Sequence, residues 1–148
     1  LGLQGNGDDT IYFGGVKRGV TFLLEGDGVA NWAYVEKIDD TPDVTEIGSI
    51  VAAFYTPNNP SATVLINNQG VALGASSTGG ERVISTGSVT INNAIAINLQ
   101  VQDGDAVVES VAGNQAETLN LTAVEDLTIT DALPAGLDTI NATGVTGL

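Results

Sequence analysis

The chain has 148 residues and a formal net charge of −14, from 18 acidic and only 4 basic side chains. Such a surface repels phosphate backbones, and no apolar run approaches the length of a membrane span, so nucleic-acid binding and membrane insertion are excluded. There is no Cys and no His, which excludes disulfides, thiolate chemistry, an ordinary zinc site and a histidine-based catalytic triad.

Composition predicts an all-β protein. Val, Ile and Thr make up 43 of the 148 residues and Gly another 19, whereas no long stretch has a helical period. Branched side chains favour strands, and Gly favours the turns between them. We expect a single all-β domain over residues 1–148, as a module of a longer or assembling protein.

The first turn signal lies near the start of the chain. Residues 5–9 read Gly-Asn-Gly-Asp-Asp and are followed by Thr10 and Ile11. This composition is typical of a tight β-turn. Residues 20–24 then predict a strand, residues 30–38 favour a strand over a short helix, and residues 39–43 predict a solvated loop.

The middle of the chain, residues 61–113, has the clearest strand pattern. Residues 62–66 and 71–73 flank Asn-Asn-Gln-Gly, which suits a four-residue hairpin loop. After the turn candidate Asn92-Asn93, apolar residues alternate with smaller or polar ones, at positions Ile95, Ile97, Leu99 and Val101. The predicted fold is an antiparallel sandwich or jelly-roll-like meander in this middle region.

The tail, residues 117–148, carries shorter alternating segments at 119–121, 127–129 and 140–142. Val124, Leu127 and Ile129 are followed thirteen residues later by Leu137, Ile140 and Ala142. Repeated short strands predict stacked, β-solenoid-like rungs at the ends of the chain. A rung cannot bury its apolar face alone, so it needs a neighbour. The expected core includes Ile95, Ile97, Leu99, Leu127, Ile129 and Ile140.

These end segments resemble a known group of proteins. Residues 5–11 are similar to one copy of the RTX nonapeptide, with Gly5, Gly7, Asp9 and Ile11 in register and Gln4 at the first Gly position. The tail, with its Leu-x-Leu strands and Thr-Gly steps, resembles the β-strand repeats of bacterial S-layer proteins and RTX-type surface adhesins. The resemblance covers residues 1–13 and 115–148 only.

The resemblance implies that Ca²⁺ is a possible cofactor. In that family an Asp and backbone carbonyls bind Ca²⁺ between stacked turns, and Asp9 stands at the ligand position with Asp8 beside it. Asp103 and Asp105 form a second acidic pair across a Gly. Because Ca²⁺ takes six to eight oxygens, either site needs ligands from another turn or another chain.

Enzymatic activity is not expected. Only Lys17, Lys37 or carboxylates remain as a base for a nucleophilic Ser or Thr. The acidic pairs suggest turns rather than a glycosidase site, and aromatic residues, at 5% of the chain, are too few for a sugar cleft.

The expected function is that of an extracellular structural module at a bacterial cell surface, such as an S-layer, adhesin or filament subunit. It would bind copies of itself through strand edges. Alternatives are a bacteriophage virion protein, as a decoration or fibre domain, and a carbohydrate-binding module. We expect the two chain ends to be junctions in one continuous β surface, with an interface at Leu1, Leu3, Leu137, Ile140, Val145 and Leu148.

Overall fold

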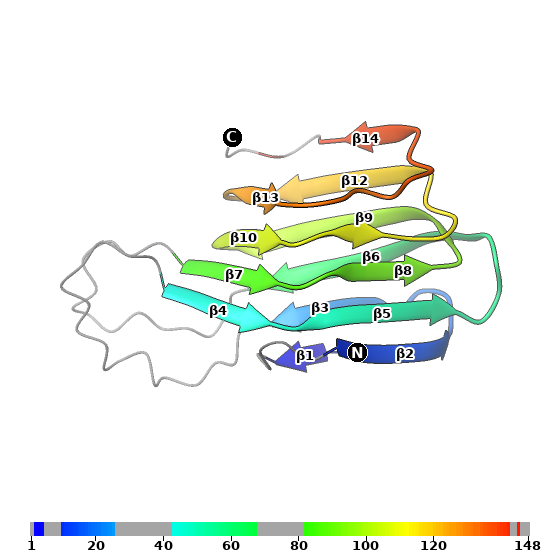
Figure 1. Ribbon diagram of the computed structural model, residues 1–148, viewed down its shortest axis with the longest axis horizontal. Coiled ribbons are helices and arrows are strands. Elements are labelled where there is room, and N and C mark those ends of the chain that lie inside the picture. Colours follow the sequence, from blue (N-terminus) through cyan, green and yellow to red (C-terminus); the bar gives the residue numbers. More distant parts are fainter. Residues whose placement is uncertain (1, 5–9, 26–42, 68–81, 143–144, 146–148) are drawn as a thin grey trace.

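The computed structural model describes residues 2–4, 10–25, 43–67, 82–142 and 145 (Figure 1). Within these ranges the chain forms fourteen β-strands and no helix, which confirms the all-β class. The strands belong to three sheets, which we call A, B and C.

Sheet A contains, in spatial order, β1 (Gly2–Gln4), β3 (Thr21–Glu25), β6 (Asn59–Asn67), β9 (Ala94–Asp103), β12 (Thr118–Ala123) and β14 (Thr139–Asn141). Sheet B contains β2 (Thr10–Val16), β5 (Ser49–Phe54), β8 (Val89–Asn92) and β11 (Val111–Ala112). Sheet C contains β4 (Asp43–Ile47), β7 (Arg82–Thr86), β10 (Asp105–Val108) and β13 (Leu127–Ile129).

Every strand pair is parallel, and the chain visits the sheets in a fixed order. Each complete coil supplies one strand to sheet C, one to sheet B and one to sheet A, as in β7, β8 and β9. In Figure 1 the strands of sheets B and C point one way and those of sheet A point the other. The protein is therefore a parallel β-solenoid, whose coils stack from β1 and β2 at one end to β14 at the other.

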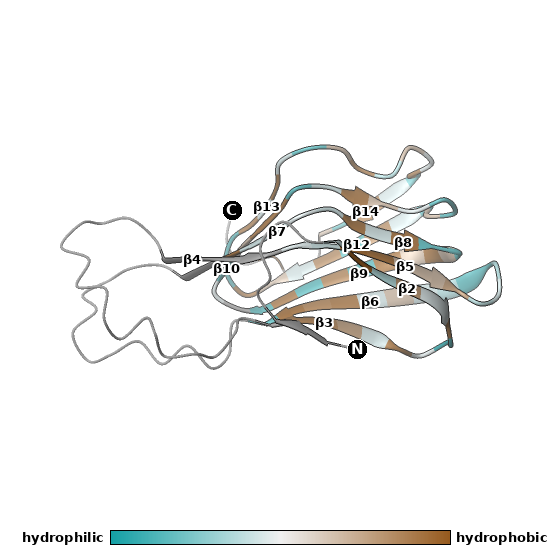
Figure 2. Cartoon of the chain, turned by 60° about the horizontal axis from the view of Figure 1, so that its bottom comes forward, coloured by the Kyte–Doolittle hydropathy of each residue, from teal (hydrophilic) through white to brown (hydrophobic). Residues whose placement is uncertain are grey.

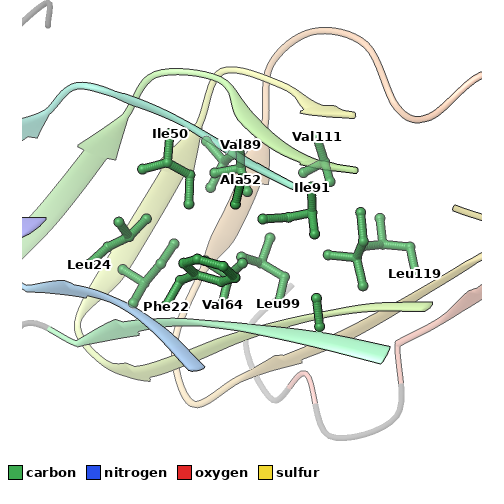
Figure 3. Close-up of a cluster of buried hydrophobic side chains, with 14 of the residues drawn as sticks. Phe22, Leu24, Ile50, Ala52, Val64, Val89, Ile91, Leu99, Val111 and Leu119 are labelled. Atoms are coloured by element: carbon green, nitrogen blue, oxygen red, sulfur yellow. The ribbon is translucent and has the colours of Figure 1, made fainter. Parts of the chain in front are cut away.

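The core lies between sheet A and the wall formed by sheets B and C. Buried and less buried positions alternate in strands such as β5 and β8, and Figure 2 shows hydrophobic and more polar residues alternating along the strands of sheet A. Figure 3 shows inward side chains of both walls meeting, among them Phe22, Val64 and Leu99 from sheet A and Ile50 and Ile91 from sheet B. All five are at most 1% exposed.

The coils differ in length. Sheet A aligns Thr21, Thr63, Asn98, Asn120 and Asn141 in successive coils. The steps between them are 42, 35, 22 and 21 residues, by subtraction of these numbers. Only the last two coils are short enough to repeat regularly. The extra residues of the earlier coils lie between the strands, where a solenoid tolerates insertions.

Corners of the solenoid use residues that accept unusual backbone angles. Gly104, between sheets A and C, has φ 69°, and Asn93, between sheets B and A, has φ 67°. Asn is one of the few non-glycine residues that tolerate this region. The predicted turn at Asn92-Asn93 is confirmed at this corner, where the Asn93 side chain donates to the Phe54 carbonyl at 2.9 Å.

The expected antiparallel sandwich or jelly-roll-like middle is wrong. Strands β6 to β11 pair in parallel across coils, and the coils run through the middle of the chain rather than only at its ends. A hairpin from residues 62–66 has no room, because β3 and β9 already occupy both edges of β6. Residues 71–73 themselves lie outside the described residues.

The thirteen-residue repeat is also wrong. Sheet pairing places Leu127 beside Ala106 and Ile140 beside Leu119, so the true spacing is 21 residues in both cases. Of the expected core residues, Ile97 and Leu99 are fully buried, whereas Ile95 is half-buried and Ile140 is 51% exposed. Leu127 and Ile129 are half-buried and pack against the core.

Candidate assembly surface

The C-terminal end of the solenoid is the first candidate site. Strand β14 pairs with β12 on one edge, and no other strand of the described chain lies on its second edge. Strand β13 is likewise the last strand of sheet C and pairs with β10 alone. The last coil therefore presents two strand edges, which are templates for pairing with a further strand.

Inward-facing apolar side chains are uncovered at this end. Ala62, Ile97, Leu119 and Ile140 share one inward column of sheet A. Ile97 and Leu119 are 0% exposed because a coil lies on each side of them, whereas Ile140 is 51% exposed. Leu133, in the same last coil, is 38% exposed. The last coil thus leaves apolar side chains partly exposed that a further coil would cover, with Ile140 more exposed than Leu133.

A polar ladder runs along the outer face of sheet A to the same end. Asn120 donates its side-chain amide to Asn98 Oδ1 at 2.7 Å, and Asn141 donates to Asn120 Oδ1 at 2.8 Å. Asn98 in turn donates to Thr63 Oγ1 at 3.4 Å. Thr21 occupies the next position of this column in the first coil. Each side chain is in register with the next, so the ladder fixes the alignment of the coils.

The N-terminal end has a different character. A sharp corner joins β2 to β3 through Lys17 and Arg18, followed by Gly19 with φ 79°. Both basic side chains are exposed, and they are two of the four bases in the chain. They lie beside an open hollow of about 490 Å³ lined by Gly15, Val16, Lys17, Arg18, Tyr55 and Thr56. This corner can accept carboxylates.

The core is better closed at this end. The Phe22 ring lies 5.8 Å from the Phe13 ring and 6.3 Å from the Phe54 ring, measured between centroids. Phe22 and Leu24, the inward residues of β3, are each only 1% exposed. Strand β1 pairs with the second half of β3, at Leu23 to Glu25. The first half of β3 carries no further strand of the described chain.

The exposed charges of the C-terminal end differ from those of the Lys17–Arg18 corner. The last coil and the corner before it carry five exposed acids, which are Glu117, Glu125, Asp126, Asp131 and Asp138. No Lys or Arg occurs after Arg82 in the whole sequence. The C-terminal end is therefore acidic, whereas the Lys17–Arg18 corner at the other end is basic.

Only part of the predicted calcium site lies in the described structure. Asp8 and Asp9 lie outside the described residues, and the side chain of Asp103 is not described. Asp105 begins β10, and its Oδ1 accepts a hydrogen bond from the Asp126 backbone amide at 3.0 Å. This contact ties two successive A-to-C corners together. Among the described residues, no three acidic side chains gather as a metal site would require.

The predicted interface residues are distributed between the two ends. Leu137 and Val145 are half-buried against the core of the last coil, and Ile140 is exposed beside them. Leu3 lies in β1 at the opposite end of the stack. Leu1 and Leu148 lie outside the described residues. Leu3 and the C-terminal residues lie at opposite ends of one molecule, so a contact between them requires two copies.

The ladder and the equivalence of the corners were not predicted from the sequence. Their signal was the repeated Asn in Asn98-Leu99, Asn120-Leu121 and Asn141-Ala142, at steps of 22 and 21 residues. Two similar steps are too few to reveal a repeat in the sequence. The first two coils are longer, so their equivalent residues do not follow the same spacing.

Comparison with known proteins adds no relative: no family model, no curated protein and no solved structure matches this chain. In the described residues no helix combines the length and the apolarity that crossing a membrane requires.

Proposed function

We propose that this protein is a structural, non-enzymatic module that acts outside the cell and assembles with copies of itself. The proposed contact is the C-terminal end of the solenoid, through the edges of β13 and β14. The single observation that carries the proposal is the 51% exposure of Ile140, an inward-facing residue whose counterparts Ile97 and Leu119 are completely buried.

Burial supplies the driving force. Covering a large aliphatic side chain contributes about 1.5–3 kcal/mol relative to full exposure, and Ile140 would gain part of this. Leu133, at 38% exposure, would add to it. Strand pairing along β14 would orient the contact, because an added strand must satisfy the backbone groups of the edge. A further coil in this position repeats the arrangement that already joins the coils of sheet A.

Sedimentation velocity over a range of protein concentrations tests the proposal on the full chain. We expect the wild-type protein to assemble and Ile140→Asp to stay monomeric, because a carboxylate at that rim cannot be buried without a partner. Ser61→Asp is the matched control, since it adds the same charge at an exposed position of β6, away from β13 and β14, and should assemble like the wild type. A wild-type monomer at high concentration, with and without Ca²⁺, would overturn the proposal.

A further inference from the structure

We propose, resting on the function proposed above, that the copies stack head to tail. The acidic C-terminal end of one copy would dock on the basic N-terminal corner of the next, with Asp138 facing Arg18 of that copy. The occupant of the open end is then a defined surface, namely the B-to-A corner and the first half of β3 in a second copy.

Register identifies the two surfaces as equivalent positions of a coil. Thr21 and Asn141 belong to one column of sheet A, at its first and last coils. Asp138 is three residues before Asn141, and Glu117 is three residues before Asn120; the Glu117 carbonyl accepts from the Asp138 amide at 2.8 Å. In the first coil the corresponding stretch is the Lys17–Arg18 corner, which leads through Gly19, with φ 79°, into Thr21. An in-register stack therefore brings Asp138 to this corner, where its carboxylate can pair with Arg18.

The same alignment matches the neighbouring positions. Asn141, the last member of the polar ladder, would meet Thr21, so the column of Asn and Thr would continue into the next copy. Ile140 would meet Val20, which is half-buried against the N-terminal end of the core. One translation thus matches an apolar and a polar position of β14 with similar residues at the start of β3, and brings the acidic end to the basic corner.

Among the described residues, the first half of β3 has no strand on its outer edge. Strand β1 covers Leu23 to Glu25 and leaves Thr21 and Phe22 at the edge, where β14 would pair. Strand β14 has three residues and pairs with the first half of β12, Thr118 to Asn120, but not with its second half, Leu121 to Ala123. It therefore matches the first half of β3 in position.

Charge selects this arrangement over a tail-to-tail dimer. A two-fold contact between C-terminal ends would bring the five acids of one copy against the same five of another, within the screening length of about 10 Å at 0.1 M salt. A head-to-tail contact brings them to Lys17 and Arg18 instead. In a head-to-tail contact each copy uses two different surfaces, so the last copy always has one surface free to bind another. Repeated addition then produces an open filament.

Reversing the charges tests the inference. In sedimentation at low salt, Asp138→Arg and Arg18→Asp should each raise the concentration needed for half-assembly by about tenfold. The double variant carrying both changes should regain most of the lost assembly, because the pair is restored with opposite polarity. Glu109→Arg, the same charge change at an exposed acid between β10 and β11, one coil before the last, should have little effect. At 1 M NaCl, where screening is about 3 Å, the effect of each single variant should largely vanish.

The outcomes separate this inference from the proposed function. A wild type that assembles but is unaffected by Arg18→Asp, while Asp138→Arg promotes pairing with wild type, would overturn head-to-tail stacking in favour of a tail-to-tail dimer. A double variant that assembles no better than the single variants would also overturn it. A wild type that never assembles would instead remove the proposed function itself.

Discussion

Asn120 donates its side-chain amide to Oδ1 of Asn98, one coil away, at 2.7 Å. The two residues are 22 positions apart in the sequence, which is the length of one coil at this point. The contact therefore joins the repeat of the sequence to the stacking of the structure. Asn141 extends it by a second hydrogen bond, so Asn120 is the middle member and uses both its carbonyl and its amide.

Removing the middle of the ladder should destabilise the last coils. Asn120→Ala leaves Asn98 Oδ1 and the Asn141 amide without this partner, and each lost hydrogen bond costs about 0.5–1.5 kcal/mol. We expect a loss of about 1–2 kcal/mol in the free energy of unfolding, measured with urea at low protein concentration so that assembly does not contribute. Thr122→Ala, an exposed position on the same strand, is the control. Equal stability of the two variants would show that the ladder contributes nothing in solution.

Gly113 should not tolerate a side chain. A Cβ at this position would lie 2.5 Å from the Ile91 carbonyl oxygen and 3.1 Å from the Ala116 Cβ, one coil corner packed on another. Neither neighbour is a flexible chain end, so Gly113→Ala should cost about 1–3 kcal/mol by overpacking. The control is Gly136→Ala, where the nearest atom, the Ala116 carbonyl oxygen, is 3.8 Å away. The control should change stability by less than about 0.5 kcal/mol. Similar urea midpoints for the two variants would contradict the described packing of this corner.

Much of the local structure could be predicted from the sequence. Segment 119–121 lies within β12, segment 127–129 is β13, and Ile140 lies in β14. The alternation at Ile97, Leu99 and Val101 marks an inward face correctly. These predictions depend only on the two-residue period of a strand, which every β fold shares.

The identity of neighbouring strands could not be predicted in the same way. A flattened solenoid and an antiparallel sandwich both place two walls of alternating strands around one core, so their sequences alternate alike. Only the repeat length separates them, and coil lengths of 42 and 35 residues precede the 22- and 21-residue coils here. The proposed contact between Asp138 and the Lys17–Arg18 corner depends on the same alignment of coils, so it could not be predicted from the sequence either.

Calcium binding stays a prediction. The resemblance of residues 5–11 to the RTX nonapeptide places Asp9 at a ligand position, and we expect millimolar Ca²⁺ to raise the thermal unfolding midpoint. Screening of the −14 net charge would raise it too, so NaCl at equal ionic strength is the reference. Asp9→Asn should remove the excess effect of Ca²⁺, whereas Asp131→Asn should keep it. If Ca²⁺ and NaCl have the same effect on the wild type, the calcium site is wrong.

Two isoleucines in β9 offer the sharpest test of the solenoid geometry. The sequence predicts that both Ile95 and Ile97 are buried, but in the structure Ile97 is 0% exposed and Ile95 is only half-buried. Ala94, Ile97, Leu99 and Val101 are buried, so the alternation of buried and less buried positions in β9 is interrupted between Ala94 and Ile97.

The same substitution at the two positions should therefore have unequal costs. Ile97→Ala opens a cavity between Ala62 and Leu119 of the neighbouring coils and should cost about 2–5 kcal/mol. Ile95→Ala removes side-chain atoms that are partly in water already and should cost about 1 kcal/mol or less. Urea unfolding of both variants, in one buffer and at one concentration, measures the difference. Equal losses would mean that β9 presents both side chains to one core, as in the rejected meander, and would overturn the register on which the stacked coils depend.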